Sequence, residues 1–199
     1  GGVNMVNTRR AKFSLDRLTE TKRMLKSNSV RSLLLDDDGQ LWMGISTYGF
    51  GVKDRQTGKF IHYNQMPDFM SYEGISTVMS IMQSPTTGHI WIGVYNGGAY
   101  ELDKQAPVGK RVKAHNSGNA PWMCNSCIYD IYEDSKQNLW FATRGGVSMR
   151  AADGTPVRID SLKVGGVAIQ DMVAMQLTEG GNGEMWMASN THGVVRIQG

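Results

Sequence analysis

Two cysteines stand three positions apart in the stretch Cys124-Asn125-Ser126-Cys127, and a C-x-x-C pair can carry redox chemistry or bind a metal. A redox pair needs its first cysteine at the N-terminus of a helix, whereas this pair lies where a loop enters a predicted strand. A structural zinc site takes four ligands, and the chain has no second C-x-x-C. We therefore expect no redox catalysis and no metal site. In an oxidising periplasm a local disulfide or two half-buried thiols are expected.

Carboxylates would support glycoside hydrolysis if two of them faced one cleft. Five are available, and nothing in the pattern places two together: Glu73, Glu101, Asp103, Glu133 and Asp134. Four histidines fall in different parts of a repeating unit and are not expected to share a layer: His62, His89, His115 and His192. The sequence therefore predicts a segment without enzyme activity, cofactor or metal.

Sugar binding asks for different chemistry, namely flat apolar ring faces beside a few hydrogen-bonding groups. Seven residues of this kind fall in predicted loops on one face of the fold: Tyr48, Tyr95, Asn96, Arg144, Asn190, His192 and Trp122. The alternative is that the Tyr and Trp rings only pack the loops. Trp122, in the loop 116–126, would then plug the mouth of the fold instead of offering a stacking platform.

The elements that position these loops repeat along the chain. Trp42, Trp91, Trp140 and Trp186 each sit between large apolar residues and are 49, 49 and 46 positions apart. Five glycines keep nearly the same period in a second register: Gly2, Gly51, Gly98, Gly146 and Gly193. A period in the forties indicates stacked supersecondary units.

Each period predicts four strands, named a to d in chain order, with a tight Asp, Asn or Gly turn between a and b. Strand a is predicted at Val30–Leu35, Thr77–Met82, Ile128–Glu133 and Met172–Leu177, and strand b carries the Trp. Strand c follows a glycine, and strand d is predicted at Lys59–Tyr63, Lys110–Lys113 and Pro156–Ile159.

Strand b is apolar at consecutive positions, so both of its faces must be covered. No segment has the length and period of a covering helix, so the cover must be the neighbouring repeat. Four-stranded antiparallel sheets packed face to face around an axis form a β-propeller. The four Trp side chains are then expected to fill the interfaces between blades.

The predicted fold is an all-β propeller segment of four blades and an N-terminal half-blade, forming one partial domain. The expected repeats are about 1–27 (the half-blade), 28–75, 76–124, 125–168 and 169–199. The half-blade would place strand c at Gly1–Asn7 and strand d at Ala11–Phe13. A segment of a longer propeller is favoured over a closed four-blade ring. Its partners would be the remaining blades, and its apolar ends would promote self-association.

Composition excludes several classes of protein. The 199 residues are 40% hydrophobic and carry a net charge of +3, ordinary values for a globular domain. The short basic run Lys110–Lys113 is interpreted as an exposed strand edge, so no nucleic-acid partner is expected. No run reaches the ~18 apolar residues of a membrane span, so no membrane segment is expected in this chain.

The repeat closely resembles the two-component regulator propeller repeat, on the stretches Asn28–Asp36 with Gly39–Gly44, and Asn125–Asp134 with Asn138–Val147. In that family such repeats build the periplasmic sensor region of hybrid two-component histidine kinases of Bacteroidetes. The resemblance implies a non-catalytic, periplasmic ectodomain segment that binds a glycan or another small molecule and signals to a kinase. A propeller enzyme, either a lyase or a hydrolase, and a pure protein-interaction scaffold are the competing functions.

Overall fold

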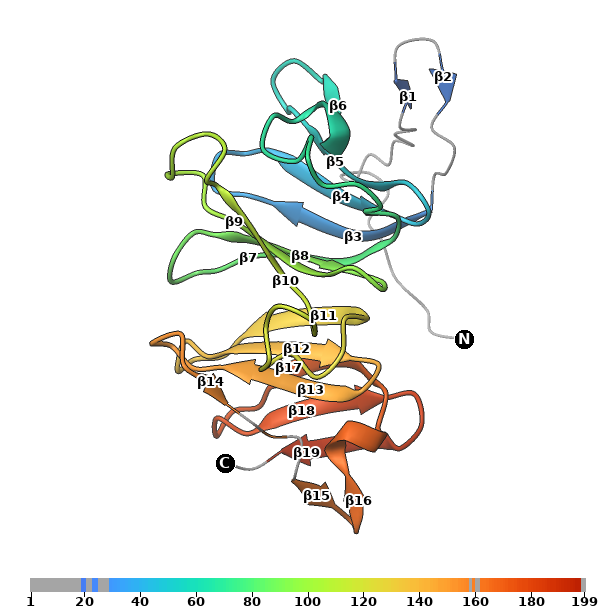
Figure 1. Cartoon of the computed structure of the whole chain (residues 1–199), viewed down its shortest axis with the longest axis vertical. Helices are drawn as coiled ribbons and strands as arrows, with labels where there is room; N and C mark the ends of the chain where they lie inside the picture. Colours follow the sequence, from blue (N-terminus) through green and yellow to red (C-terminus); the bar gives the residue numbers. More distant parts are fainter. Residues whose placement is uncertain (1–18, 21–22, 25–28, 158, 160–161, 198–199) are drawn as a thin grey trace, which may run out of the picture.

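The computed structural model describes residues 19–20, 23–24, 29–157, 159 and 162–197 (Figure 1). These residues form β-strands joined by turns, with two short 3-10 turns, η1 (Tyr63–Gln65) and η2 (Ile169–Asp171). Across the described residues, no helix has the length and apolar character that crossing a membrane requires.

Antiparallel sheets form one after another along the chain, each from strands that are consecutive in sequence. The first sheet contains β3 (Val30–Leu35), β4 (Leu41–Ile45), β5 (Gly49–Lys53) and β6 (Phe60–His62). The second contains β7 (Val78–Gln83), β8 (Ile90–Val94), β9 (Gly98–Leu102) and β10 (Val112–His115). The third contains β11 (Ile128–Glu133), β12 (Leu139–Thr143), β13 (Gly146–Arg150) and β14 (Pro156–Val157). The fourth contains β17 (Ala174–Glu179), β18 (Met185–Ser189) and β19 (Gly193–Ile197).

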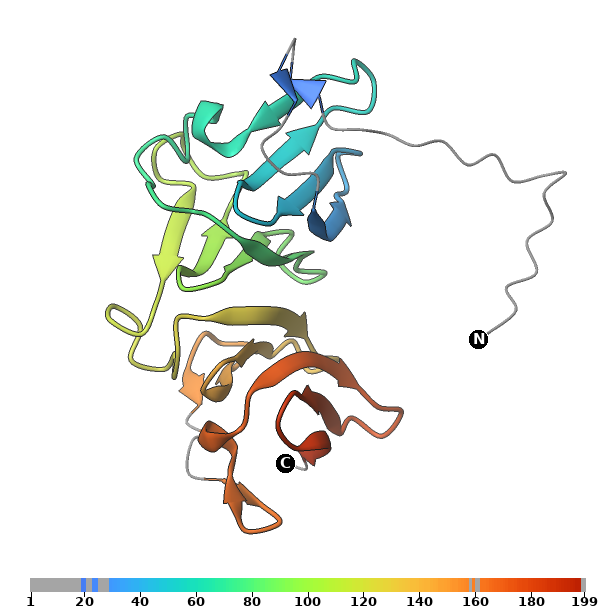
Figure 2. The ribbon, with the colours of Figure 1, turned by 90° about the vertical axis from the view of Figure 1, so that its right-hand side faces the viewer.

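Two additional ribbons lie outside these sheets. They pair β1 (Thr19–Glu20) with β2 (Arg23–Met24) and β15 (Lys163–Val164) with β16 (Val167–Ala168). In Figure 2 the four sheets follow one another along an arc, from the blue first sheet at the top to the red fourth sheet at the bottom. The all-β architecture with four-stranded antiparallel sheets is confirmed.

Two predicted strands, at Met172–Leu177 and Lys110–Lys113, begin two residues later in the structure, and those at Thr77–Met82 and Lys59–Tyr63 begin one residue later. Strand a of the fourth repeat starts at Ala174 instead of Met172, because the Met172 N–H closes the η2 turn on Ile169 O at 3.0 Å. The predicted strand Lys110–Lys113 is shifted to Val112–His115, because Lys110 closes a turn on Pro107 O at 2.9 Å. The predicted half-blade strands Gly1–Asn7 and Ala11–Phe13 lie outside the described residues, and the number of blades and the repeat limits stay predictions.

Trp side chains fill the interfaces between sheets, as predicted. Trp42 lies in the cluster that joins the first and second sheets, Trp91 in the one that joins the second and third, and Trp140 in the one that joins the third and fourth. Their exposed fractions are only 5%, 1% and 8%. Trp186 is half-buried in the last sheet, where the Arg196 guanidinium lies 5.7 Å from its ring. One large aromatic residue per interface therefore accounts for the Trp period.

Polar contacts between sheets also repeat. A residue in the turn after strand a donates a hydrogen bond to the side chain of the last residue of strand a in the next sheet. The three bonds are Asp37 N to Gln83 Oε1 (3.0 Å), Thr86 Oγ1 to Glu133, and Ser135 N to Glu179 Oε2 (2.8 Å). Deeper in the interfaces, Ile131 N donates to Ser80 Oγ (3.3 Å) and Leu177 N to Asp130 Oδ2 (3.0 Å). These bonds set the spacing between successive sheets, and so the spacing of the loops at their edges.

Candidate functional site

The turns between strands b and c share one backbone anchor in all four sheets. The first residue of each turn donates its N–H to the carbonyl just before strand a, at 2.8–3.1 Å. The four donors are Ser46, Tyr95, Arg144 and Asn190. The fold thus holds the backbone at this position while leaving its side chain free to vary. Three of the seven predicted ligand-binding residues occupy it.

Strand a carries a second repeated feature, a β-bulge near its start. The register shifts after Val30, Val78, Ile128 and Ala174 in the four strands. Each shift leaves one residue outside the pairing, in the order Arg31, Met79, Tyr129 and Met175. A bulge re-aims the side chain of the extra residue and is common beside binding sites. The sequence analysis did not identify these residues.

Tyr129, the bulged residue of β11, brings two of the predicted residues together. Its ring packs against Tyr95 with 6.0 Å between the ring centroids and 69° between the planes, and 37% of Tyr95 remains exposed. Burial and the neighbouring Cys127 thiol raise the pKa of the Tyr129 hydroxyl, and the positive charge of Arg144 opposes that shift. The Arg144 N–H also bonds to Cys127 O, two residues before Tyr129. Tyr95, Tyr129 and Arg144 are therefore grouped as the rim cluster, between the second and third sheets.

The other predicted residues of the turns lie apart from the ring contacts of this cluster. Asn96 is exposed beside Tyr95, with a left-handed φ of 61°. Tyr48 is half-buried in the first sheet, where its ring packs 4.3 Å from that of His62. Asn190 and His192 are exposed on the last sheet, and His192 Nδ1 lies 2.7 Å from Thr191 Oγ1.

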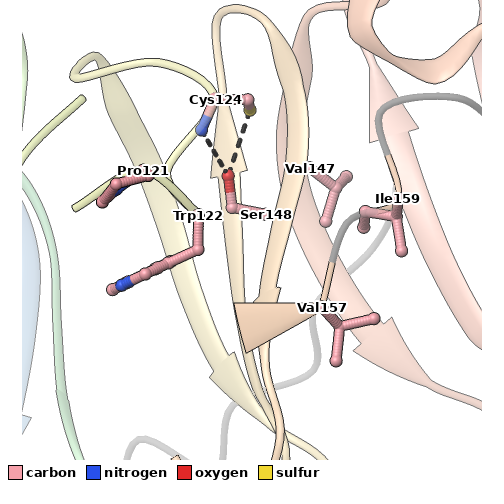
Figure 3. Close-up of a pocket in the computed structure, with 7 residues that line it drawn as sticks. All are labelled: Pro121, Trp122, Cys124, Val147, Ser148, Val157 and Ile159. Carbon is pink, nitrogen blue, oxygen red and sulfur yellow. Dashed lines mark hydrogen bonds between the residues drawn. The ribbon is translucent and has the colours of Figure 1, made fainter. Parts of the chain in front are cut away.

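Trp122 packs into the molecule. It is half-buried, and its ring lies 5.1 Å from that of Phe141 and 5.7 Å from that of His115. Figure 3 shows it at a cavity of about 40 Å³ that Pro121, Cys124, Val147, Ser148, Val157 and Ile159 also line. That space holds water molecules but not a sugar ring. These contacts favour the packing interpretation of Trp122 over a stacking platform.

Both cysteines are free thiols in the structure. Cys124 is exposed, and Ser148 Oγ lies 3.1 Å from its sulfur, while Cys127 is 1% exposed. Cys124 precedes a strand and does not begin a helix. Of the two expected states, a disulfide or two half-buried thiols, the structure has two free thiols. They are not both half-buried, because Cys127 is buried and Cys124 is exposed.

Two histidines meet on one buried carboxylate, contrary to the expectation that the histidines are spread apart. His89 Nδ1 lies 2.9 Å from Glu101 Oε1, and His115 Nε2 lies 3.0 Å from Glu101 Oε2. Arg150 Nη1 of the third sheet lies 3.6 Å from the same carboxylate. Burial acts to raise the pKa of Glu101, but the hydrogen bonds from His115 and His89 and the charge of Arg150 outweigh it and lower the pKa to about 2. Sequence spacing could not find this cluster because it joins strand ends from two sheets.

Glu101 occupies a strand position that is apolar in two of the other repeats. The residues paired with the four tryptophans across strands b and c are Val52, Glu101, Met149 and Arg196. Glu101 and Glu133 line the same hollow of about 60 Å³. Both Glu101 oxygens already have imidazole partners, so this carboxylate is not poised as a nucleophile. In the described part of the chain, no three His, Cys, Asp or Glu side chains are grouped so as to hold a metal ion.

A family model described as two component regulator propeller matches residues 24–47 and 123–145. A relative called histidine kinase P4, from Formosa agariphila, is 25% identical over 152 residues, which are 76% of this chain and 11% of that protein. The chain thus spans about a tenth of the length of this relative.

Solved structures share the fold. The extracellular domain of a putative hybrid two component system from B. thetaiotaomicron has a TM-score of 0.66 at 21% identity, covering 92% of this chain and 24% of that one. A virginiamycin B lyase from Staphylococcus aureus has a TM-score of 0.58 at 15% identity, covering 88% of this chain and 58% of that one. In the two matched stretches the chain is thus similar to two-component regulator propeller repeats, and it shares its fold with these solved structures.

Proposed function

We propose that this chain is a ligand-sensing segment of the periplasmic region of a hybrid two-component histidine kinase. We further propose that it binds a glycan-derived ligand without chemistry. The regulator repeats, the histidine kinase relative and the fold shared with extracellular domains of two-component systems support the sensor assignment. The single observation that carries ligand binding is the rim cluster, where Tyr95 and Arg144 on anchored turns flank Tyr129 at the bulge of β11.

The rim cluster suits a sugar for physical reasons. Tyrosine offers a flat apolar face for the C–H surface of a pyranose and a hydroxyl at its edge. Arginine presents five N–H donors in a fixed plane. Tyr95 and Arg144 stand on short hairpin turns, so little backbone entropy is lost when a ligand orders them. Asn96, exposed next to Tyr95, adds an amide within the same turn.

Further blades and self-association belong to the same proposal. One apolar residue of each strand a packs against the preceding sheet and is buried there. Its exposed fraction is 6% for Ile81, 4% for Ile131 and 3% for Leu177. The corresponding Leu33 of the first sheet is 63% exposed, and Val194 of the last sheet is 74% exposed. Additional blades, or a second copy, would cover these apolar ends.

The experiment is a calorimetric screen of neutral and acidic oligosaccharides against the chain and its Tyr95→Ala variant. Binding that Tyr95→Ala weakens about tenfold or more supports the proposal. Met70→Ala is the matched control, because Met70 is 66% exposed on a different loop and should bind as the parent does. The proposal fails if no saccharide binds, or if Tyr95→Ala leaves the affinity unchanged.

A lyase or hydrolase is the second candidate, because Glu101 and Glu133 share one hollow. Incubation with the same oligosaccharides, followed by assays for new reducing ends and for unsaturated products, separates this candidate from a sensor. Turnover that Glu133→Gln abolishes would establish an enzyme. Absence of products together with Tyr95-dependent binding supports the sensor.

A further inference from the structure

Charge is distributed unevenly over the turns between strands b and c. These turns are residues 46–48, 95–97, 144–145 and 190–192. They contain no Asp or Glu, and they contain one arginine and one histidine. The arginine, Arg144, falls at the anchored first position, where its N–H bonds to Cys127 O, two residues before Tyr129 of the rim cluster.

Arg144 lacks the carboxylate partners that three other cations of the described residues have. Lys104 pairs with Asp36 and Asp38, Arg111 with Asp68, and Arg150 with Glu101. Arg144 is exposed and makes no ion pair with any carboxylate of the described residues. Its backbone is nevertheless fixed, because its N–H donates to Cys127 O at 3.1 Å and the hairpin turn holds Arg144 and Gly145 alone. A charge without a carboxylate partner among the described residues is thus held on a backbone that is fixed by hydrogen bonding.

The repeats provide an internal comparison for this arrangement. At the anchored position the other sheets carry Ser46, Tyr95 and Asn190, so the turn does not need an arginine. At the bulge the other sheets carry Arg31, Met79 and Met175, so strand a does not need an aromatic residue. An aromatic residue and a cation coincide where the second and third sheets meet. The shared backbone therefore explains neither choice, and a ligand explains both.

We propose that the rim cluster binds a saccharide that carries an acidic group, with Arg144 taking the acid and the Tyr95–Tyr129 pair taking the sugar ring. The inference rests on the proposed function and names its ligand class. A guanidinium pairs with a carboxylate or a sulfate through two parallel N–H···O bonds. A neutral sugar would leave that charge without a counterion, and a cationic one would be repelled.

The test measures affinity by calorimetry for four oligosaccharides of equal length: oligogalacturonide, its methyl ester, a sulfated galacto-oligosaccharide and the neutral galacto-oligosaccharide. We expect at least one acidic form to bind tenfold or more tightly than its uncharged counterpart, since hydrogen bonds to charged groups are worth about that factor. A preference for oligogalacturonide over its methyl ester identifies a carboxylate as the recognised group. A preference for the sulfated sugar over the neutral one identifies a sulfate.

Three variants assign the preference to the cluster. Arg144→Gln should lose the acidic preference without a change in melting temperature, because the side chain is exposed. Arg144→Lys should retain part of it, since the charge stays while the planar fork is lost. Arg31→Gln is the matched control, because Arg31 is exposed at the equivalent bulge of the first sheet and should bind as the parent does.

Two outcomes overturn the inference in distinguishable ways. If the neutral sugar binds as tightly as the acidic ones and Tyr95→Ala abolishes that binding, the sensor function stands and the acidic ligand is wrong. The same holds if Arg144→Gln keeps the acidic preference. If none of the four sugars binds to the parent chain, the acidic ligand is wrong, and the wider oligosaccharide screen decides whether the glycan-sensing proposal stands.

Discussion

The indole Nε1 of Trp42 donates a hydrogen bond to Asp36 Oδ2 at 2.8 Å, and Trp140 makes the same bond to Asp134 at the same distance. The second carboxylate oxygen accepts the N–H of Gln40 in one repeat and of Asn138 in the other, both at 2.8 Å. One aspartate therefore closes the turn between strands a and b and also orients the Trp that fills the interface.

Replacing Asp134 with Ala should destabilise the chain by about 1–3 kcal/mol, the cost of leaving buried donors without a partner. Trp140 Nε1 and Asn138 N would both lose their acceptor. Urea unfolding of Asp134→Ala and of the control Asp37→Ala measures the effect, because Asp37 is exposed at an equivalent turn. Equal stability of the two variants would contradict this view of the turn.

Replacing the interface tryptophans should be more costly still. Trp91→Ala and Trp140→Ala are each expected to lose about 3–5 kcal/mol, as in other large-to-small changes of buried aromatic residues. Trp186→Ala should lose less, because Trp186 is half-buried on the last sheet. Denaturant melts of the three variants test this order. Two interface variants as stable as the parent would disprove the packing argument.

Glu101 should make the stability of the chain depend on acid. Its pKa is about 2 in the folded chain against 4.5 for an ordinary glutamate, so its ionised form stabilises the fold above pH 4.5. That contribution, about 3 kcal/mol at most, is lost as the pH falls from 4.5 toward 2. Unfolding curves measured across this range should show the loss in the parent chain and not in Glu101→Gln.

Glu73→Gln provides the control for that experiment, because Glu73 is exposed on a loop. This variant should follow the acid dependence of the parent chain. If Glu101→Gln also follows it, the low pKa of Glu101 contributes nothing to stability, and the cluster with His89 and His115 is only a local arrangement.

The isolated chain should self-associate through its apolar ends, where Leu33 and Leu35 are 63% and 53% exposed. Leu33→Lys should weaken this association, because a charge would have to be buried in the contact. Met70→Lys, at an exposed loop position, should not. Sedimentation velocity over a range of concentrations measures the effect. A compact monomer at every concentration would argue for a closed ring.

Much of the architecture followed from the sequence because it is locally encoded. The Trp period, the Asp, Asn and Gly turns and the consecutive apolar residues of strand b act within single hairpins. Turns fix the register of such hairpins over a few residues. Strands β4, β8, β12 and β18 therefore lie where the Trp stretches predicted them. The placing of Trp42, Trp91 and Trp140 in the interfaces follows from the same pattern.

The candidate site needed the tertiary structure because its contacts join different repeats. Tyr129 meets Tyr95 from the neighbouring sheet through a bulge that no residue pattern announces. Glu101 gathers His89, His115 and Arg150 although 61 positions separate the first and last of these three. Trp122 faces the core because Phe141 and His115 receive its ring. Periodicity reports which face of a strand is buried, but only the packing of one sheet on the next decides which side chains meet there.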